Sequence, residues 1–130
     1  MNNKVRGTAF ERRVCQELAD NGYWVHFITP DARGAQPFDI IAVKNTIARA
    51  IECKTLASNR RYFTIDRLEE NQKMAFKKWK ICGNNNRWIA VEWRGDIYII
   101  RYERLEREGK IDMMEEIAYG RESRNVKQTC

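Results

Sequence analysis

Residues 37–54 read PFDIIAVKNTIARAIECK, two apolar runs separated by a short polar turn. The runs at 38–43 and 48–53 have the length of typical strands, and the turn residues Lys44 and Asn45 lie between them. This pattern predicts a pair of strands joined by a tight turn. The rest of the fold and the candidate site can be worked out from this pair.

The paired strands carry charges where a sheet is normally apolar. Asp39 opens the first run, and Glu52 and Lys54 close the second. Because strand side chains alternate between the two faces, Glu52 and Lys54 project to the same side. If the runs pair as a hairpin, Asp39 and Glu52 fall near the same end. Two carboxylates that close repel each other unless one is protonated or a cation lies between them.

Oxygen ligands of this kind suit a hard ion such as Mg²⁺, which keeps several waters and accepts substrate phosphates. Lys54 beside them can hold a phosphate or a water while a metal neutralises developing charge. The alternative is a surface ion pair at a strand end. The hairpin alone does not decide between these two interpretations.

The first helix adds a third carboxylate. Residues 5–21 place Phe10, Val14 and Leu18 at helical spacing, which predicts one buried face. Glu11 lies on the same stripe, so its carboxylate should stand on or beside that buried face. A lone helix glutamate is usually solvated, but this one is expected to point to where Asp39 and Glu52 converge.

A second helix is predicted from about Asp66 to Cys82. Asp66 is the expected N-cap, with Glu69 completing a capping box. Gln72 lies within the apolar stripe of this helix, where its amide can hydrogen-bond in the site. The alternative is a satisfied polar residue at the edge of the stripe.

The remaining segments complete the predicted order α-β-β-β-α-β-β. Strands are expected at 23–28, 87–93 and 96–102, with a loop at 29–37, an irregular segment at 56–64, short helix or coil after 103, and a frayed tail at 121–130. A long helix between two strands suggests a crossover that joins parallel strands. We therefore expect an α/β fold with a mixed central sheet flanked by helices.

The chain of 130 residues has the size of one domain, with a core at about 4–102 and a C-terminal helix and tail at 103–130. With 43% hydrophobic residues it is not a disordered sequence. No apolar run approaches the roughly 20 residues of a membrane span, and the polar start is not a signal peptide. We expect a cytoplasmic protein, in a prokaryotic cell or a virus-infected host cell.

The cysteine and histidine pattern argues against two other site types. Cys15, Cys53, Cys82 and Cys130 lack metal-binding spacing, and His26 is the single histidine. A zinc site is therefore not expected, and a nucleophile activated by histidine would have to recruit a residue from an apolar strand.

Lysine and arginine outnumber aspartate and glutamate by 24 to 18, a net charge of +6. Such an excess fits a polyanionic partner such as nucleic acid, although a solubilising surface explains it equally well. Position favours the first explanation, because many of these cations lie near the predicted site: Arg6, Arg12, Arg13, Arg33, Arg60, Arg61, Lys73, Lys77, Lys78 and Lys80.

A helix glutamate, then Asp39, then the tripeptide Glu52-Cys53-Lys54 resembles the PD-(D/E)xK nuclease superfamily, which has a restriction-endonuclease-like core. Within it the chain looks most like the archaeal-type Holliday junction resolvases, which also occur in bacteriophages. The similarity covers roughly residues 4 to 100. One departure is that Phe38 separates Pro37 from Asp39, whereas the motif's proline usually precedes the aspartate directly.

The resemblance implies roles for individual residues. Glu11, Asp39 and Glu52 would hold one or two Mg²⁺ ions, with the backbone carbonyl of Cys53 as a further ligand and Mn²⁺ as an expected substitute metal. Lys54 would orient or activate the attacking water, and Gln72 would sit beside it. The expected DNA contacts are Arg6, Gly7, Arg12, Arg33, Thr55, Arg60, Arg61 and Lys73.

The resemblance also implies an activity and a partner. A homodimer of such a nuclease would cut opposing strands of a four-way DNA junction symmetrically. The hints of a dimer surface are Trp88, Trp93 and Tyr98, which look exposed, and the segment MMEEIAYG at 113–120, with ordinary core residues as the alternative. Two rival functions remain open: a nuclease of the same superfamily acting on flaps or duplex DNA, and a basic DNA-binding module without catalysis.

Overall fold

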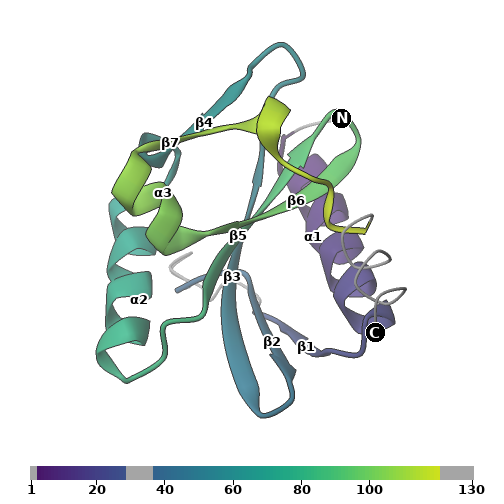
Figure 1. The fold of residues 1–130 in the computed structure, drawn as a ribbon. Helices are drawn as coiled ribbons and strands as arrows, with labels where there is room; N and C mark the ends of the chain where they lie inside the picture. The colour runs from purple at the N-terminus through teal and green to yellow at the C-terminus, as the bar shows by residue number, and fades with distance from the viewer. Residues whose placement is uncertain (1–2, 29–36, 121–130) are drawn as a thin grey trace.

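The computed structural model describes residues 3–28 and 37–120, with side chains described from Ala9 onward. A mixed five-stranded sheet with the order β1-β2-β3-β5-β6 forms its centre (Figure 1). The strands are β1 (Trp24–Phe27), β2 (Ile40–Lys44), β3 (Ile47–Thr55), β5 (Arg87–Trp93) and β6 (Asp96–Arg101). Only β3 and β5 pair in parallel, and the other neighbours are antiparallel. The predicted α/β mixed sheet is confirmed.

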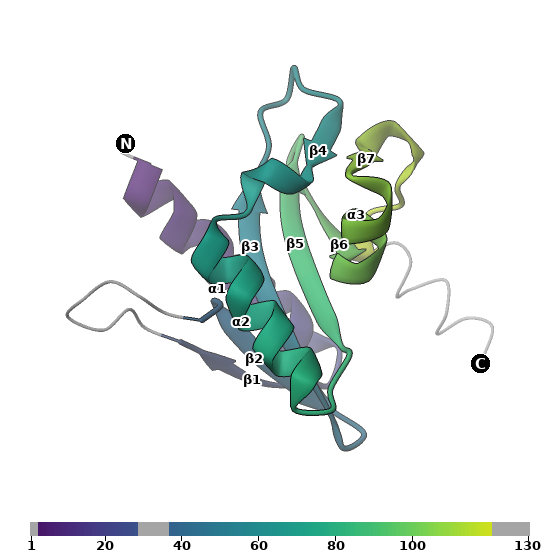
Figure 2. The same ribbon diagram turned by 90° about the vertical axis from the view of Figure 1, so that its left-hand side faces the viewer.

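Helices cover both faces of this sheet. Figure 1 shows α1 (Asn3–Asp20) on one face and α2 (Glu70–Ile81) with α3 (Tyr102–Glu108) on the other, and Figure 2 shows α2 and α3 in front of the sheet with α1 behind it. A small second sheet joins β4 (Tyr62–Thr64) to β7 (Lys110–Asp112), and short 3-10 turns follow each of these strands. Among the described residues, no helix combines the length and apolar character needed to cross a membrane.

Each face of the sheet has its own apolar core. Under α1, Phe10, Val14 and Leu18 pack against Ile40 and Ile51. The other core joins α2 and α3 to the opposite face, and Phe76, Leu105 and Ile89 lie fully buried within it. Since burying a large apolar side chain stabilises a fold by roughly 1.5–3 kcal/mol, these two layers fix where α1 and α2 stand relative to the strands.

The crossover through α2 brings two strand ends together. β3 and β5 run in parallel, with Glu52 opposite Ile89 and Thr55 opposite Glu92. In open α/β sheets, the carboxyl ends of parallel strands are the usual place for a ligand site. The motif at the end of β3 therefore stands at the edge where a site is expected.

The β2–β3 hairpin brings Asp39 and Glu52 to the same end, as the sequence predicts, but its turn lies one residue later than the predicted Lys44 and Asn45, because Lys44 still pairs with Ile47. Ile40 lies opposite Ile51, and the Asp39 amide donates to the Ile51 carbonyl at 3.1 Å. The two turn residues, Asn45 and Thr46, have φ values of 54° and 67°. Positive φ at both central positions is the geometry of tight hairpin turns, which favour Asn-Gly. Thr46 is β-branched and is strained there.

Replacing the strained turn residue should stabilise the protein. We expect Thr46→Gly to raise the free energy of unfolding by about 0.5–1 kcal/mol, because the relief of positive-φ strain exceeds the entropic cost of glycine. Thr46→Ala keeps the Cβ and is the matched control, with a smaller effect or a loss. Urea denaturation of the three proteins checks this, and a Thr46→Gly variant less stable than the wild type would contradict it.

Three details differ from the sequence-based expectations. The segment at 56–64, predicted to be irregular, contains β4, which pairs with a strand almost fifty residues later. The N-cap of α2 is Glu69 rather than Asp66, which lies in a preceding 3-10 turn. Trp93 and Tyr98 are only 3% and 8% exposed, so they are core residues and no dimer surface can be built on them.

Candidate active site

Asp39 stands at the start of β2 and is held by the neighbouring strand. Its side chain is 4% exposed. The Cys53 amide donates to Asp39 Oδ2 at 2.8 Å, while the Asp39 amide donates to Ile51. Main-chain groups on both sides of Glu52 therefore fix the aspartate beside the end of β3. This confirms that the hairpin brings Asp39 and Glu52 to the same end.

Glu52 is equally buried, at 4% exposure, on the face of the sheet that α2 covers. Gln72 Nε2 donates to Glu52 Oε1 at 2.9 Å. Burial raises the pKa of Glu52 well above its usual range, and the charge of Asp39 and a hydrogen bond to it raise it further. The nearby charge of Lys54 acts in the opposite direction. The two acids thus share one crowded, poorly solvated environment.

Glu11 reaches the same place from the opposite face. Partial burial, followed by the charge of Asp39, raises the pKa of Glu11 to about 7. The same carboxylates, together with burial, raise the pKa of the Cys15 thiol. Asp39 is therefore the shared neighbour of Glu11 and Glu52, as the stripe on the first helix predicts.

Gln72 ties the site to the start of α2. Its Oε1 accepts from the Glu69 amide at 2.9 Å, and the Glu69 side chain caps the Gln72 amide in return. The same side chain donates to Glu52 through Nε2. One amide group therefore hydrogen-bonds both the helix end and the buried acid.

The donor set fits a hard divalent cation. Burial and the charge of Asp39 raise the pKa of both Glu11 and Glu52, which marks a place that lacks positive charge, and oxygen donors are those that Mg²⁺ prefers. Within residues 3–28 and 37–120, no three Asp, Glu, His or Cys side chains lie close enough together to hold an ion as they stand. Small side-chain rotations would therefore accompany binding, because Asp39 and Glu52 are each held by a hydrogen-bond donor.

The backbone carbonyl of Cys53 is placed to join them. The Ile51 carbonyl faces β2, where it accepts from Asp39, and carbonyls two residues apart on a strand point the same way. The Cys53 carbonyl thus points toward the edge where β2 has ended.

The predicted DNA contacts lie in different settings. Arg12 and Arg60 are exposed, while Arg61 makes a bidentate pair with Asp112 at 2.8 Å. The others are distributed as follows: Thr55 ends β3, Lys73 lies 3.4 Å from Glu70, Arg6 and Gly7 belong to α1 without described side chains, and Arg33 lies outside the described residues, as does the tail with Cys130. The three carboxylates thus lie near one another, whereas the predicted cationic contacts are spread over several elements.

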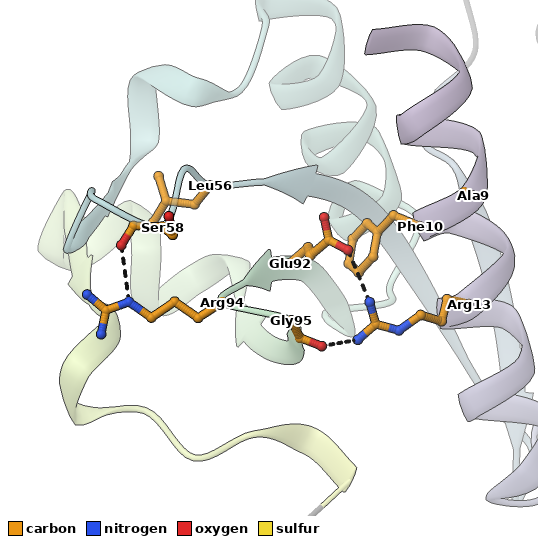
Figure 3. A pocket seen from close by; sticks show the side chains of 8 residues that line it. All are labelled: Ala9, Phe10, Arg13, Leu56, Ser58, Glu92, Arg94 and Gly95. Carbon is orange, nitrogen blue, oxygen red and sulfur yellow. Dashed lines mark hydrogen bonds and ion pairs between the residues drawn. The ribbon is translucent and has the colours of Figure 1, made fainter. Parts of the chain in front are cut away.

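Sequence reasoning names Arg13 as a cation near the site but misses the group that it forms with Glu92 and Arg94 beside this centre. Arg13 and Arg94 flank a cavity next to the ends of β3 and β5, with Glu92 between them (Figure 3). Arg13 and Glu92 are 79 residues apart in the chain, so no local pattern predicts their contact. The only sequence signal is an arginine placed in the turn before Gly95.

Comparison with known proteins gives a family and a fold. Residues 2–127 match the family model described as archaeal Holliday junction resolvase. Among solved structures, the chain is similar to the Hjc Holliday junction resolvase of the archaeal hyperthermophile Archaeoglobus fulgidus, with a TM-score of 0.65 and 21% sequence identity over 91% of this chain and 95% of that one. No curated protein matches.

Proposed function

This chain belongs to the archaeal Holliday junction resolvase family of DNA endonucleases, and on that premise we propose that it cuts opposing strands of a four-way junction symmetrically in a Mg²⁺-dependent reaction. One observation carries the proposal. Glu11, Asp39 and Glu52, from three separate elements, converge at the carboxyl end of β3 with Lys54 beside them. Neither a surface ion pair nor a structural core accounts for three coupled carboxylates there.

We propose a role for each residue of the site. Asp39, Glu52 and Glu11 hold the cation, together with the Cys53 carbonyl. When bound, Mg²⁺ lowers the pKa of a water and neutralises charge on the phosphate, and Mn²⁺ supplies the same chemistry. Lys54, on the same face as Glu52, orients the attacking water and stabilises the developing negative charge. Gln72 keeps the Glu52 carboxylate in place.

The cations around the centre contact phosphates without reading bases, so binding should weaken steeply with salt. We propose this role for the exposed Arg12 and Arg60 and for Lys73, with the neutral hydroxyl of Thr55 at the end of β3 as a further phosphate contact. Arg61 would have to leave Asp112 to take part. Selectivity for the junction then comes from shape rather than from sequence.

Symmetric cutting requires two sites, and we propose a homodimer that acts in the cytoplasm. The support is the excess of exposed apolar side chains on α2, where Met74 and Ile81 are 51% and 73% exposed. Sedimentation of the wild type beside Met74→Lys with Ile81→Lys tests this placement. A dimer unaffected by the double substitution would move the interface elsewhere.

A fixed four-way junction, a linear duplex of the same sequence and a flap substrate test the activity. We expect paired nicks in opposing strands of the junction that require Mg²⁺ and disappear in EDTA. Equal cutting of duplex or flap would point instead to a different specificity within the same superfamily. Binding without cleavage in Mg²⁺ or Mn²⁺ would favour the DNA-binding module.

Two substitutions of Gln72 separate its hydrogen bond to Glu52 from its part in capping α2. Gln72→Glu keeps an oxygen for the Glu69 amide but replaces the donor to Glu52 with another carboxylate, so we expect cleavage to fall roughly tenfold, with a loss of stability that appears only at the higher pH where the two acids repel each other. Gln72→Ala loses both contacts and should also cost about 1 kcal/mol of unfolding free energy. Single-turnover cleavage and thermal unfolding check the pair. Full activity of Gln72→Glu would remove Gln72 from the site.

A further inference from the structure

A cavity of about 460 Å³ lies beside the candidate active site, between α1 and the β5–β6 hairpin. Figure 3 shows Arg13 from α1 and Arg94 from the hairpin on two sides of it, with Ser58 from the loop after β3 beyond Arg94. Phe10 and Leu56, each from a different core, form the apolar part of its wall. The cavity therefore sits off the end of the sheet, where the two layers meet.

Its distance from the catalytic centre is short. Leu56 follows Lys54 by two residues, about 7 Å along an extended chain, and Phe10 adjoins Glu11 on α1. One strand of DNA rises about 3.4 Å per nucleotide. A strand that runs from the carboxylates along this edge would reach the cavity one or two nucleotides from the phosphate that is cut.

Arg13 is fixed in place with donors to spare. Its Nη1 donates to Glu92 Oε2 at 3.0 Å and its Nη2 to the Gly95 carbonyl at 2.6 Å. A guanidinium has five N–H donors in a planar fork that matches phosphate geometry. The side chain remains 45% exposed, so the pair with Glu92 orients the guanidinium without covering it.

Arg94 occupies a costly position for an arginine. Its φ is 51° and that of Gly95 is 83°, the positive pair that two-residue hairpins require and that asparagine fills better than arginine. The guanidinium stacks on the ring of Trp93 at 4.2 Å, and Nε donates to the Ser58 carbonyl at 3.1 Å. Strained residues held by several contacts are often functional.

We propose that Arg13 and Arg94 form a phosphate subsite for the DNA strand, one or two nucleotides from the scissile phosphate. Two guanidinium groups and one carboxylate leave the cavity with a net charge of +1, which favours an anion. The subsite holds the strand in register with Glu11, Asp39 and Glu52. Two arginines can bind a phosphate of any nucleic acid. That the phosphate belongs to junction DNA rests on the proposed function.

The test combines a substitution with neutral phosphates. Arg94→Asn removes the charge while suiting the turn, and Arg107→Gln removes an exposed charge from α3 as the matched control. Junctions that carry a single methylphosphonate at successive positions beside the cut are bound in EDTA. For the unmodified junction, we expect Arg94→Asn to raise the dissociation constant roughly fivefold over that of the wild-type protein. The slope of the logarithm of the binding constant against the logarithm of the salt concentration should fall by about one, and Arg107→Gln should change neither quantity.

The deciding observation is whether the effects of Arg94→Asn and of a methylphosphonate on binding are additive. At one or two positions, the methylphosphonate should weaken the wild type but have no further effect on Arg94→Asn. Effects that add at every position would overturn the subsite, even if cleavage is intact. Coupling without any cleavage in Mg²⁺ would leave the subsite standing and remove the proposed chemistry.

Glu92 provides an independent check. Glu92→Gln keeps an acceptor for Arg13 and removes the negative charge, so the subsite predicts junction binding several-fold tighter than in the wild type. If the pair served only to fasten α1 to the hairpin, the substitution would leave binding unchanged or weaken it. Either of those outcomes contradicts a role for Arg13 in binding phosphate.

Discussion

Asp39→Asn should reduce single-turnover cleavage of a four-way junction by at least about 10³-fold, since a metal's contribution of several kcal/mol depends on this carboxylate. The amide oxygen of asparagine can still accept from the Cys53 amide, so the fold should survive. What is lost is the negative charge that lies between Glu11 and Glu52. Junction binding in EDTA should remain within a few-fold of the wild type.

The matched control is Asp20→Asn, which removes a carboxylate from the far end of α1, where it accepts a local hydrogen bond from Gln16. It should cleave at the wild-type rate. An Asp39→Asn protein that folds, binds the junction and keeps a tenth or more of the wild-type rate would remove Asp39 from the catalytic centre.

Glu52→Gln should abolish cleavage and at the same time stabilise the metal-free protein at pH 8. Glutamine imitates the protonated acid: it can accept from Gln72 and donate toward Asp39. We expect a gain on the order of 2 kcal/mol, or roughly 5 °C in Tm or more, because the wild type must keep Glu52 protonated at a pH where the unfolded chain ionises freely, and glutamine does not have this cost. Thermal unfolding in EDTA at several pH values measures it.

The pH dependence has a definite sign. Burial and Asp39 raise the folded-state pKa of both Glu11 and Glu52 above that of the unfolded chain. Groups shifted in this direction contribute stability that is fully present below the unfolded pKa of 4.5 and is lost as pH rises through the folded value, about 7 for Glu11. Wild-type stability should therefore fall between pH 4.5 and 8.

The advantage of Glu52→Gln should vanish near pH 4.5, where the wild-type acid is itself protonated. Glu11→Gln should show the same trend with a smaller gain of about 1 kcal/mol, since its side chain is partly exposed and screened. Addition of Mg²⁺ should stabilise the wild type and not Glu52→Gln. A Glu52→Gln protein less stable than the wild type at pH 8 would show that the three carboxylates do not repel one another.

Local patterns predict the parts of the site that lie on regular elements. The hairpin at 37–54 fixes Asp39 opposite the end of β3, and alternation along β3 puts Glu52 and Lys54 on one face. The helical stripe places Glu11 beside the core. A crossover helix then sets β5 parallel to β3 and leaves their carboxyl ends at one edge. Each of these inferences needs only the periodicity of apolar residues and the length of the segment that joins two strands.

Contacts between distant segments cannot be read this way. β4 and β7 pair across almost fifty residues, and Arg13 meets Glu92 across 79, without any periodic signal. The N-cap of α2 was misplaced because Asp66 and Glu69 both suit a helix start, and tertiary packing chose the later one. Packing also decided which aromatic residues of the last two strands are buried.

The account rests on a divalent cation bound by carboxylates from α1, β2 and β3. Fe²⁺ with ascorbate and peroxide, added to the protein with bound junction, produces radicals that cut the backbone close to the bound metal. We expect cuts near Glu11, Asp39 and Glu52 that excess Mg²⁺ suppresses and that Asp39→Asn eliminates. Cuts elsewhere, or cuts at these segments that neither Mg²⁺ nor the substitution changes, would contradict a metal centre at the end of β3.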